Sequence, residues 1–552
     1  MSNGYFRIIK RLLHLGTVYL FCAQLLFAQK NNPLHILTDK PFYVSGELLN
    51  FSAFLPQSFD RLTTMFRVAV HDADGNLKQT FYLHNHGKLF LQGYYFLPYD
   101  LTAGWYSLSI YQSLKTDDVL VGRLNIPIYN DLNIEKILPA AIKANTAIQS
   151  KSILDHSNIE LKYTKSVTYP YTMQVTGQIN RPGASTGYQV QLAVTESTLM
   201  DEIAESIKPA YEPEINSALG LVPLNSDGIM IKGQVTNEAG VGKKVTVLGA
   251  YFREQNRFYF ATPNQQGKFE LKLPVFTGPV HLQFIYHPFS GENIRIKLQT
   301  LESKIIKDEL VYSKQLIGYL EASRQRKKIA QYFKQIQSDP LHLAQAHEKN
   351  INTPDYVYRL KDYEDFRTIG EFCKEIAGLL VFKESGGQLK AQTINPNAKL
   401  DGSDQVSGNP LFIINGKLTR DAAYVAGLDF KATESLELFY LISGLRRQFN
   451  VAGNDGVVRV NTTLPIIELP AADEEDIFAI HGILPEQTKN NVLQGPVISP
   501  VVYWSEMATT DAKGTVQFNF THHDGRGKYR IRLWANGPEG QFILGQQDYE
   551  IK

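Results

Sequence analysis

The 552-residue sequence has little cysteine, with Cys22 and Cys373 alone, and only three tryptophans and six methionines. Cys22 lies in an apolar N-terminal segment that we expect to be removed. The mature chain could then form no intrachain disulfide and would depend on its hydrophobic cores for stability. The sequence also lacks an excess of charge of either sign, because its formal net charge is +1. This balance gives no electrostatic reason to expect nucleic acid or an acidic surface as a partner.

Common catalytic motifs are scarce as well. The sequence contains no H-E-x-x-H zinc motif and no P-loop. We therefore expect a protein that is not an enzyme, with no catalytic, cofactor-binding or metal-binding residues and no cofactor. A hydrolase with an unrecognised site remains an alternative, which broad hydrolase screening of the purified protein would test.

The N-terminus has the pattern of an export signal. Arg7, Lys10 and Arg11 precede an apolar stretch over residues 12–27, and Ala28 is a small residue at a plausible cleavage point. The pattern predicts a signal peptide over residues 1–28 and export to the periplasm or the outer membrane. Lipidation of Cys22 is disfavoured because the preceding Phe21 is large, and a retained anchor helix is a further alternative.

Most of the mature chain has the alternating pattern of short β-strands. One example is RVAVHDADGNLKQTFYL (67–83), where Asp74-Gly75 predicts the turn of a hairpin. Helical spacing of apolar residues occurs from residue 305, and helices alternate with strands from residue 354. We predict a β-sandwich over 29–130, a second over 131–210, a linker over 211–228, a third sandwich over 229–304, a helical connector over 305–350, a small α/β domain over 351–470, a linker over 471–495 and a C-terminal sandwich over 496–552.

Several of these segments resemble known families. TDKPFYVSGE (38–47) and GYYFLPYDLTAGWYSLSIY (93–111) resemble the Ig-like, macroglobulin-type β-sandwich, and the C-terminal sandwich does so too. Residues 229–304 resemble the carboxypeptidase regulatory-like sandwich. GNPLFIINGKLT (408–419) and GNDGVVRVNTT (453–463) resemble the two ends of the plug domain of TonB-dependent outer-membrane receptors. This combination resembles large exported proteins of Bacteroidetes, and implies a multi-domain, mainly β fold.

The resemblance to a receptor plug raises the question of a barrel. Only 89 residues follow Thr463, whereas a receptor barrel of about 22 strands needs more than about 200 residues. We therefore expect a plug-like domain without a barrel, sheltered by the helix before it and by the sandwich from residue 496. In that domain, we predict strands at 411–414 and 457–460 in one sheet and a turn at Asn415-Gly416.

The resemblances imply a non-enzymatic binding or assembly protein at the bacterial outer membrane, with the plug-like domain as a docking module. Its partners would be outer-membrane or exported proteins, with peripheral membrane association open and no nucleic acid. The alternative is a macroglobulin-like protein that binds proteases, for which a bait loop within 208–228 would be expected. It would lack covalent trapping, because no Gly-Cys-Gly-Glu-Gln thioester motif is present.

A few residues are weak candidates for chemistry, and each has a structural explanation that we favour. HDADGN (71–76) fits a hairpin turn better than half a calcium loop. A zinc site at His71, His84 and His86 is disfavoured, and His522–Asp524 fit an exposed polar loop. Cys373, on an apolar helical stripe, fits a core residue better than a nucleophile. The aromatic segment 81–100 fits core packing better than a binding face, and the basic run 324–328 fits a solvated helix face.

Overall fold

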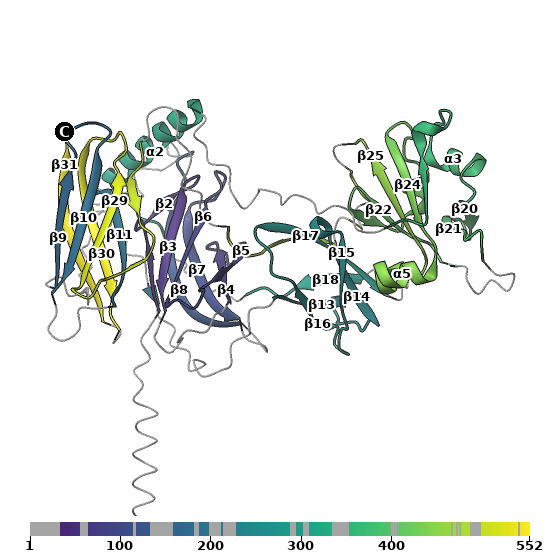
Figure 1. Ribbon diagram of the computed structural model, residues 1–552, viewed down its shortest axis with the longest axis horizontal. Helices are drawn as coiled ribbons and strands as arrows, with labels where there is room; N and C mark the ends of the chain where they lie inside the picture. Colours follow the sequence, from purple (N-terminus) through teal and green to yellow (C-terminus); the bar gives the residue numbers. More distant parts are fainter. Residues whose placement is uncertain are drawn as a thin grey trace, which may run out of the picture.

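The computed structural model confirms a multi-domain, mainly β protein (Figure 1). It describes residues 34–55, 65–113, 118–132, 158–180, 187–197, 211–212, 228–287, 294–301, 309–333, 353–398, 406, 408–464, 467–470, 473, 476–485, 498–538 and 541–552. The predicted signal peptide, Cys22 and most of the predicted bait segment lie outside these residues. Among the described helices, none is both long and apolar enough to cross a membrane.

Residues 34–132 form the first sandwich, as the strand pattern predicts. One sheet has the order β1-β3-β6, and the other has the order β12-β8-β7-β4-β5 with β2 beside β8. A core of apolar residues from both sheets fills the space between them. The strands are β1 (His35–Thr38), β2 (Tyr43–Val44), β3 (Leu48–Phe54), β4 (Met65–His71), β5 (Leu77–His84), β6 (Phe90–Phe96), β7 (Gly104–Ser113), β8 (Asp118–Tyr129) and β12 (Tyr211–Glu212).

The segments predicted as two separate sandwiches, 131–210 and 496–552, instead share one sandwich. In its first sheet β10 lies between β9 and β29, and in its second β11 lies between β27 and β30. In the described residues, 131–210 supplies β9 and β10 to the first sheet and β11 alone to the second, whereas 496–552 supplies β29 alone to the first, so each segment completes the other. This second sandwich contains β9 (Ile159–Lys165), β10 (Thr172–Ile179), β11 (Gln189–Glu196), β27 (Val501–Trp504), β28 (Ala508–Thr509), β29 (Thr515–Thr521), β30 (Gly527–Asn536) and β31 (Phe542–Ile551).

The third sandwich is formed by residues 228–301 together with a strand from the predicted linker 471–495. That strand, β26 (Ile477–His481), pairs with β17, and the residues after it run on to the first sandwich, where Leu484 donates a backbone hydrogen bond to Tyr82. Residues 476–485 therefore belong to the third sandwich and also bind the first. The other elements are β13 (Ile229–Asn237), β14 (Val247–Phe252), η5 (Arg253–Gln255), β15 (Arg257–Ala261), β16 (Lys268–Leu273), β17 (Pro279–His287) and β18 (Ile294–Leu298).

Helix α2 (Lys314–Tyr332) forms the described part of the connector. The Ser313 side chain caps its N-terminus by accepting a hydrogen bond from the Leu316 amide. Leu316 and Leu320 pack against Phe42 and Tyr129 of the first sandwich. The helix therefore covers the first sandwich. The expectation that it shelters the α/β domain is wrong.

Residues 353–464 form the α/β domain. Its sheet has the order β19-β24-β25-β22-β23, with helices and a separate hairpin, β20–β21, around it. Strand β22 pairs in parallel with β25, so the prediction of one sheet for 411–414 and 457–460 is confirmed. The elements are β19 (Tyr356–Arg359), η7 (Leu360–Asp362), α3 (Ile369–Glu375), β20 (Leu380–Ser385), β21 (Gln388–Thr393), β22 (Leu411–Ile414), β23 (Lys417–Thr419), α4 (Ala422–Ala426), β24 (Thr433–Phe439), α5 (Ile442–Phe449), η8 (Asn450–Gly453) and β25 (Val457–Thr462).

The predicted turn at Asn415-Gly416 is also confirmed. Both residues have positive φ, 45° and 82°, and they join β22 to β23 in a two-residue hairpin. Asparagine and glycine tolerate this backbone region, which explains the residue types found here. A side chain at Gly416 would also meet Arg253 of the third sandwich, because an added Cβ would lie 3.1 Å from its Cγ.

The four parts follow one another in the order second sandwich, first sandwich, third sandwich and α/β domain, from left to right in Figure 1. The chain does not visit them in that order. It passes outward to the α/β domain and returns through β26 to complete the second sandwich at the opposite end. The α/β domain is thus an insertion at the far end of a rod.

Cys373 is buried in the core of the α/β domain, as predicted, and burial raises the pKa of its thiol to about 12. We expect Cys373→Ala to lower the free energy of unfolding of this domain by about 1–2 kcal/mol, because only one buried sulfur is lost. Urea unfolding would measure the loss. Labelling of native Cys373 by a bulky reagent as fast as labelling of an exposed Val167→Cys control would contradict burial.

Candidate functional site

The three histidines considered for zinc are not brought together. His71 pairs with Leu77 and His84 with Met65, so the two histidines lie at opposite ends of the β4–β5 hairpin. The His71 ring is buried and its Nε2 donates to the Leu301 carbonyl at 3.2 Å. Over the described stretches of the chain, no group of three or more His, Cys, Asp or Glu residues could hold a metal ion.

The acidic segment at 71–76 forms the hairpin turn that we favoured. The Asp72 carboxylate accepts hydrogen bonds from the backbone amides of Asp74 and Asn76, at 3.0 and 2.8 Å, and forms an ion pair with Lys78 at 2.8 Å. Gly75 has a φ of 83°, which suits the turn. The Asp72 carboxylate is thus engaged by the turn and by Lys78.

His522 is not part of an exposed loop, which corrects our expectation. It is buried, and its ring packs edge-on against Tyr529 at 4.6 Å. The neighbouring His523 is half-buried and its Nε2 donates to the Ser499 carbonyl at 2.5 Å. Burial lowers the pKa of both imidazoles. Through these contacts with Tyr529 and Ser499, the two histidines hold the turn between β29 and β30 against the rest of the second sandwich.

The aromatic segment 81–100 mainly contributes residues to hydrophobic cores. Four of its seven rings are buried, Phe90 and Phe96 are half-buried, and Tyr99 is exposed; the buried ones are Phe81, Tyr82, Tyr94 and Tyr95. Phe81, Tyr94 and Tyr95 pack in the core of the first sandwich, whereas Tyr82 packs in the core of the third, so adjacent rings are buried on both faces of a strand. The segment therefore offers no extended aromatic face.

One motif had been missed in the sequence. Residues 183–187 have the pattern G-x-S-x-G, which in a nucleophile elbow connects a strand to a helix. Here the pattern lies between two strands, β10 and β11, and residues 181–186 are outside the described part of the chain. The context is therefore not that of a nucleophile elbow.

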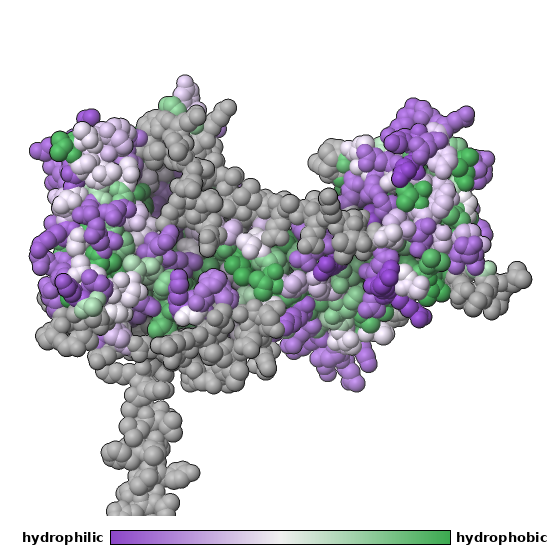
Figure 2. All heavy atoms as spheres, in the orientation of Figure 1, coloured by the Kyte–Doolittle hydropathy of each residue, from purple (hydrophilic) through white to green (hydrophobic). Residues whose placement is uncertain are grey.

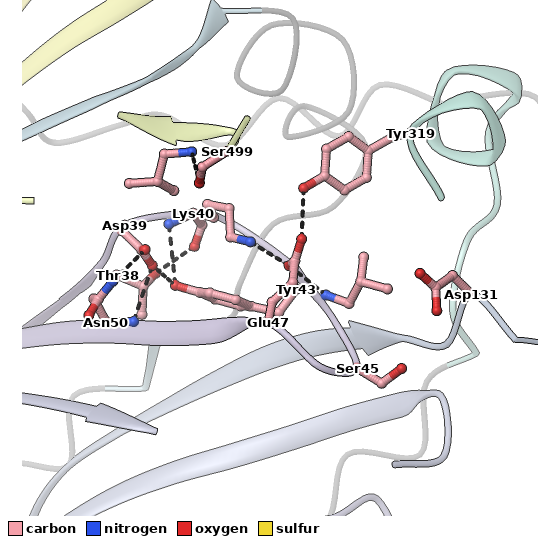
Figure 3. A network of polar contacts seen from close by, with 12 residues as sticks. Thr38, Asp39, Lys40, Tyr43, Ser45, Glu47, Asn50, Asp131, Tyr319 and Ser499 are labelled. Atoms are coloured by element: carbon pink, nitrogen blue, oxygen red, sulfur yellow. Dashed lines mark hydrogen bonds and ion pairs between the residues drawn. The ribbon is translucent and has the colours of Figure 1, made fainter. Parts of the chain in front are cut away.

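The most developed polar site is a cluster in the TDKPFYVSGE segment, which we call the polar junction (Figure 3). Lys40 is almost fully buried and forms an ion pair with Glu47. Glu47 also accepts hydrogen bonds from the Val44 amide at 2.9 Å and from the Tyr319 hydroxyl at 3.1 Å. Because Tyr319 lies on α2, the ion pair links the helix to the first sandwich.

The two carboxylates of the polar junction, Asp39 and Glu47, have pKa values shifted in opposite directions. Burial raises the pKa of Asp39, although Lys40 and the hydrogen bonds from Tyr43 and Asn50 oppose the shift. Burial would also raise the pKa of Glu47, but the charge and hydrogen bond of Lys40 outweigh it, so the pKa lies below its ordinary value. Glu47 is therefore the ionised partner of Lys40.

Two further elements reach the polar junction. From α2, Lys327 binds Asp131 at 2.6 Å and also the Ser45 carbonyl, so the basic run 324–328 is not merely a solvated face. From β30 of the second sandwich, Arg532 donates to the Asp39 carbonyl at 2.9 Å. Burial lowers the pKa of Arg532 to about 10, and Asp39 opposes that shift. The polar junction thus fixes two sandwiches and a helix relative to one another.

A second joint holds the α/β domain on the third sandwich. The Gln283 side chain on β17 donates to the Leu418 carbonyl at 2.7 Å and accepts from the Leu418 amide at 2.6 Å. Around this pair lies an apolar cluster from both domains, including Tyr251 and Phe449. The Asn415-Gly416 turn sits beside Arg253, which donates to the Asn415 carbonyl at 3.4 Å. The motif that raised the question of a barrel therefore lies at a joint between domains.

Sequence reasoning could not identify Gln283, Arg253 or Arg532, because their partners lie more than 100 residues away. Lys40 and the basic run on α2 did give a signal. A lysine two residues before the apolar run Phe42 to Val44, and basic residues that interrupt an apolar stripe, both indicate paired charges at a packed surface.

Comparisons with known proteins give little further identification. No protein-family model and no curated protein matches the chain. Among solved structures, Salmonella alpha-2-macroglobulin reacted with methylamine is 10% identical, with 94% of this chain and 39% of that chain covered and a TM-score of 0.24. The native conformation of E. coli alpha-2-macroglobulin is also 10% identical, with 95% and 40% covered and a TM-score of 0.24.

A tetra-tandem repeat from the extending region of a large adhesion protein is 9% identical, with 94% of this chain and 99% of that chain covered and a TM-score of 0.15. The chain spans about two fifths of the length of the two macroglobulins. These TM-scores are too low to establish a common arrangement. The description of the sandwiches therefore rests on their own strand pairing.

Proposed function

We propose that the chain is an exported, non-enzymatic binding or assembly protein of the bacterial outer membrane or periplasm, with the α/β domain as its docking module. The proposal includes a plug-like origin for this domain and a carboxypeptidase regulatory-like origin for the third sandwich, as in exported Bacteroidetes proteins. The N-terminal pattern and the Asn415-Gly416 hairpin beside the parallel β22–β25 pair support these assignments.

The observation that carries the docking role is the position of the α/β domain. It lies at the far end of the rod and contacts the remainder through the third sandwich, at the Gln283 joint. An inserted domain held at a tip is presented to partners, whereas the sandwiches behind it act as a spacer. On the face seen in Figure 2, the surface of this end is largely hydrophilic with small hydrophobic patches.

Affinity capture from native membranes tests the docking role. Ile376, at the end of α3, is 46% exposed, and Val167, at the β9–β10 turn of the second sandwich, is 96% exposed. We expect the full chain to retain specific envelope proteins, Ile376→Glu to retain about tenfold less of them, and the matched control Val167→Glu to retain the same amount. A loss of about tenfold corresponds to about 1.4 kcal/mol of binding free energy.

Equal capture by both variants would contradict a docking role for the α/β domain. Recovery of a protease whose activity on large substrates is blocked, together with cleavage of the chain within 208–228, would instead favour the macroglobulin-like alternative. Detection of an intact Met1 terminus on the purified protein would contradict the proposed export with cleavage after Ala28.

A further inference from the structure

Among the residues that the structure describes, strand β19 forms an edge of the sheet in the α/β domain. The sheet order places β19 at one end and β23 at the other. The β23 end is occupied, because Leu418 is bound to Gln283 of the third sandwich. Within the described residues, β19 pairs with β24 alone. Alternate backbone groups of an edge strand point away from its neighbour and can pair with another strand.

The centre of β19 does not protect this edge. Short length, charged residues and proline usually blunt natural edges, and here Pro354, Asp355 and Arg359 stand at the ends of a four-residue strand. Between them the centre is Tyr356-Val357-Tyr358, with an unbroken register against β24. Tyr356 is 42% and Val357 is 36% exposed. Aromatic and β-branched residues of this kind favour strand pairing.

The segment 355–359 is complementary to itself. Its sequence is Asp-Tyr-Val-Tyr-Arg. If two copies pair antiparallel about a two-fold axis through Val357, each Tyr356 lies opposite Tyr358 of the other copy. At the ends, each Asp355 lies opposite Arg359 of the other copy, so unlike charges face each other twice. A two-fold interface requires such self-complementarity, which few five-residue segments have.

The two charged side chains can take part. Arg359 is exposed. The Oδ2 atom of Asp355 accepts hydrogen bonds from the amides of Tyr440 and Leu441, at 2.7 and 2.8 Å, and these residues directly follow β24 on the inner side of β19. Arg359 of the second copy would therefore reach the other carboxylate oxygen, Oδ1. Because side chains alternate along a strand, Asp355, Val357 and Arg359 share one face, and the paired strand would present the same three residues in reverse order.

We propose that β19 is a homodimer interface, and that two copies of this chain associate by antiparallel pairing of residues 355–359. The partner is a second copy because the charges of segment 355–359 are complementary to those of the same segment running in the opposite direction. The sheet would then continue across the two-fold axis as ten strands, and the two rods would point away from each other. This inference does not depend on the docking function proposed above.

Cysteine cross-linking tests the geometry. Facing residues of an antiparallel pair have Cα atoms about 4.5–5.5 Å apart, within disulfide range. In a Cys22→Ser full chain, in which Cys373 stays buried, we expect Val357→Cys to form a disulfide-linked dimer under mild oxidation. The control Val167→Cys, on a valine of the second sandwich that is more exposed than Val357, at 96% against 36%, should nevertheless cross-link at least tenfold more slowly.

The charge pattern is tested by Arg359→Asp, which would place like charges opposite each other at both ends. We expect it to slow the Val357→Cys cross-link at least tenfold, whereas Arg359→Lys should change it less than threefold. Sedimentation velocity of the unmodified chain should show twice the monomer mass. Amide-exchange protection of β24 and β25 in each variant would establish that the domain remains folded.

Three outcomes would overturn the proposal. The first is a chain that stays monomeric up to about 100 µM, a range in which even weak complexes form. The second is equal cross-linking at residues 357 and 167. The third is an association that Arg359→Asp leaves unchanged. Protection of the β19 edge by a different protein, with no self-association, would likewise reject a second copy as the occupant.

Discussion

A chain that ends at residue 497 should lose the second sandwich completely. β10 and β11 would lack β27 to β31, and the buried residues Val175, Val190 and Leu192 would be exposed. Three strands of this kind cannot form a stable sandwich alone. We expect amide-exchange protection of Thr172–Ile179 and Gln189–Glu196 to fall to that of unfolded chain.

The same truncated chain contains its own control. β22 and β25 of the α/β domain have no partner in the second sandwich, so their amides should keep their protection. The β10 and β11 amides would stay protected if residues 131–210 formed a sandwich of their own, as we predicted from the sequence. Their protection in the truncated chain would therefore contradict the shared sandwich.

Lys40→Met should be the most destabilising single substitution at the polar junction. It leaves Glu47 buried and ionised without its cation, and breaking a buried ion pair typically costs about 3–5 kcal/mol. The loss should appear as faster amide exchange of Leu48–Phe54, the strand that follows Glu47. Contacts of Tyr319 with Glu47 would weaken at the same time, so α2 should detach more readily.

The double variant Lys40→Met/Glu47→Gln separates a missing charge from a missing contact. It removes both charges and leaves a glutamine that can still accept a hydrogen bond from the Val44 amide. Replacing both members of a buried pair by neutral groups is often nearly neutral, so we expect the double variant to lie within about 1 kcal/mol of the original chain. A double variant as unstable as Lys40→Met would show that packing, and not charge, accounts for the loss.

Features encoded by a few neighbouring residues could be predicted from the sequence. The Asn415-Gly416 hairpin follows from residues that tolerate positive φ, and the Asp74-Gly75 turn follows from the same preference and from the Asp72 side chain. The buried position of Cys373 follows from the period of the apolar residues around it. These predictions needed no knowledge of distant segments.

The choice of strand partners could not be predicted. β10 has the same alternation whether its neighbour is β29 or a strand of its own segment, so the shared second sandwich was missed. The linker that contains β26 was misread because its short strand is stable only beside β17. Gln283 and Arg532 looked like ordinary polar residues, since their importance comes from partners brought close by the fold.

The shared second sandwich has a consequence for the time course of folding. Gln174 and its partner Asn519 are 345 residues apart in the sequence. At roughly 5–20 residues per second, synthesis of the intervening chain takes about 20–70 s, which is far longer than the time in which strands otherwise pair. During that interval β10 has β9 alone beside it and β11 lacks β27, β28 and β30, so their apolar residues are open to wrong pairing. The earliest-made half of this sandwich must therefore wait for residues 501–551, so the complete rod can form only after these residues have been delivered.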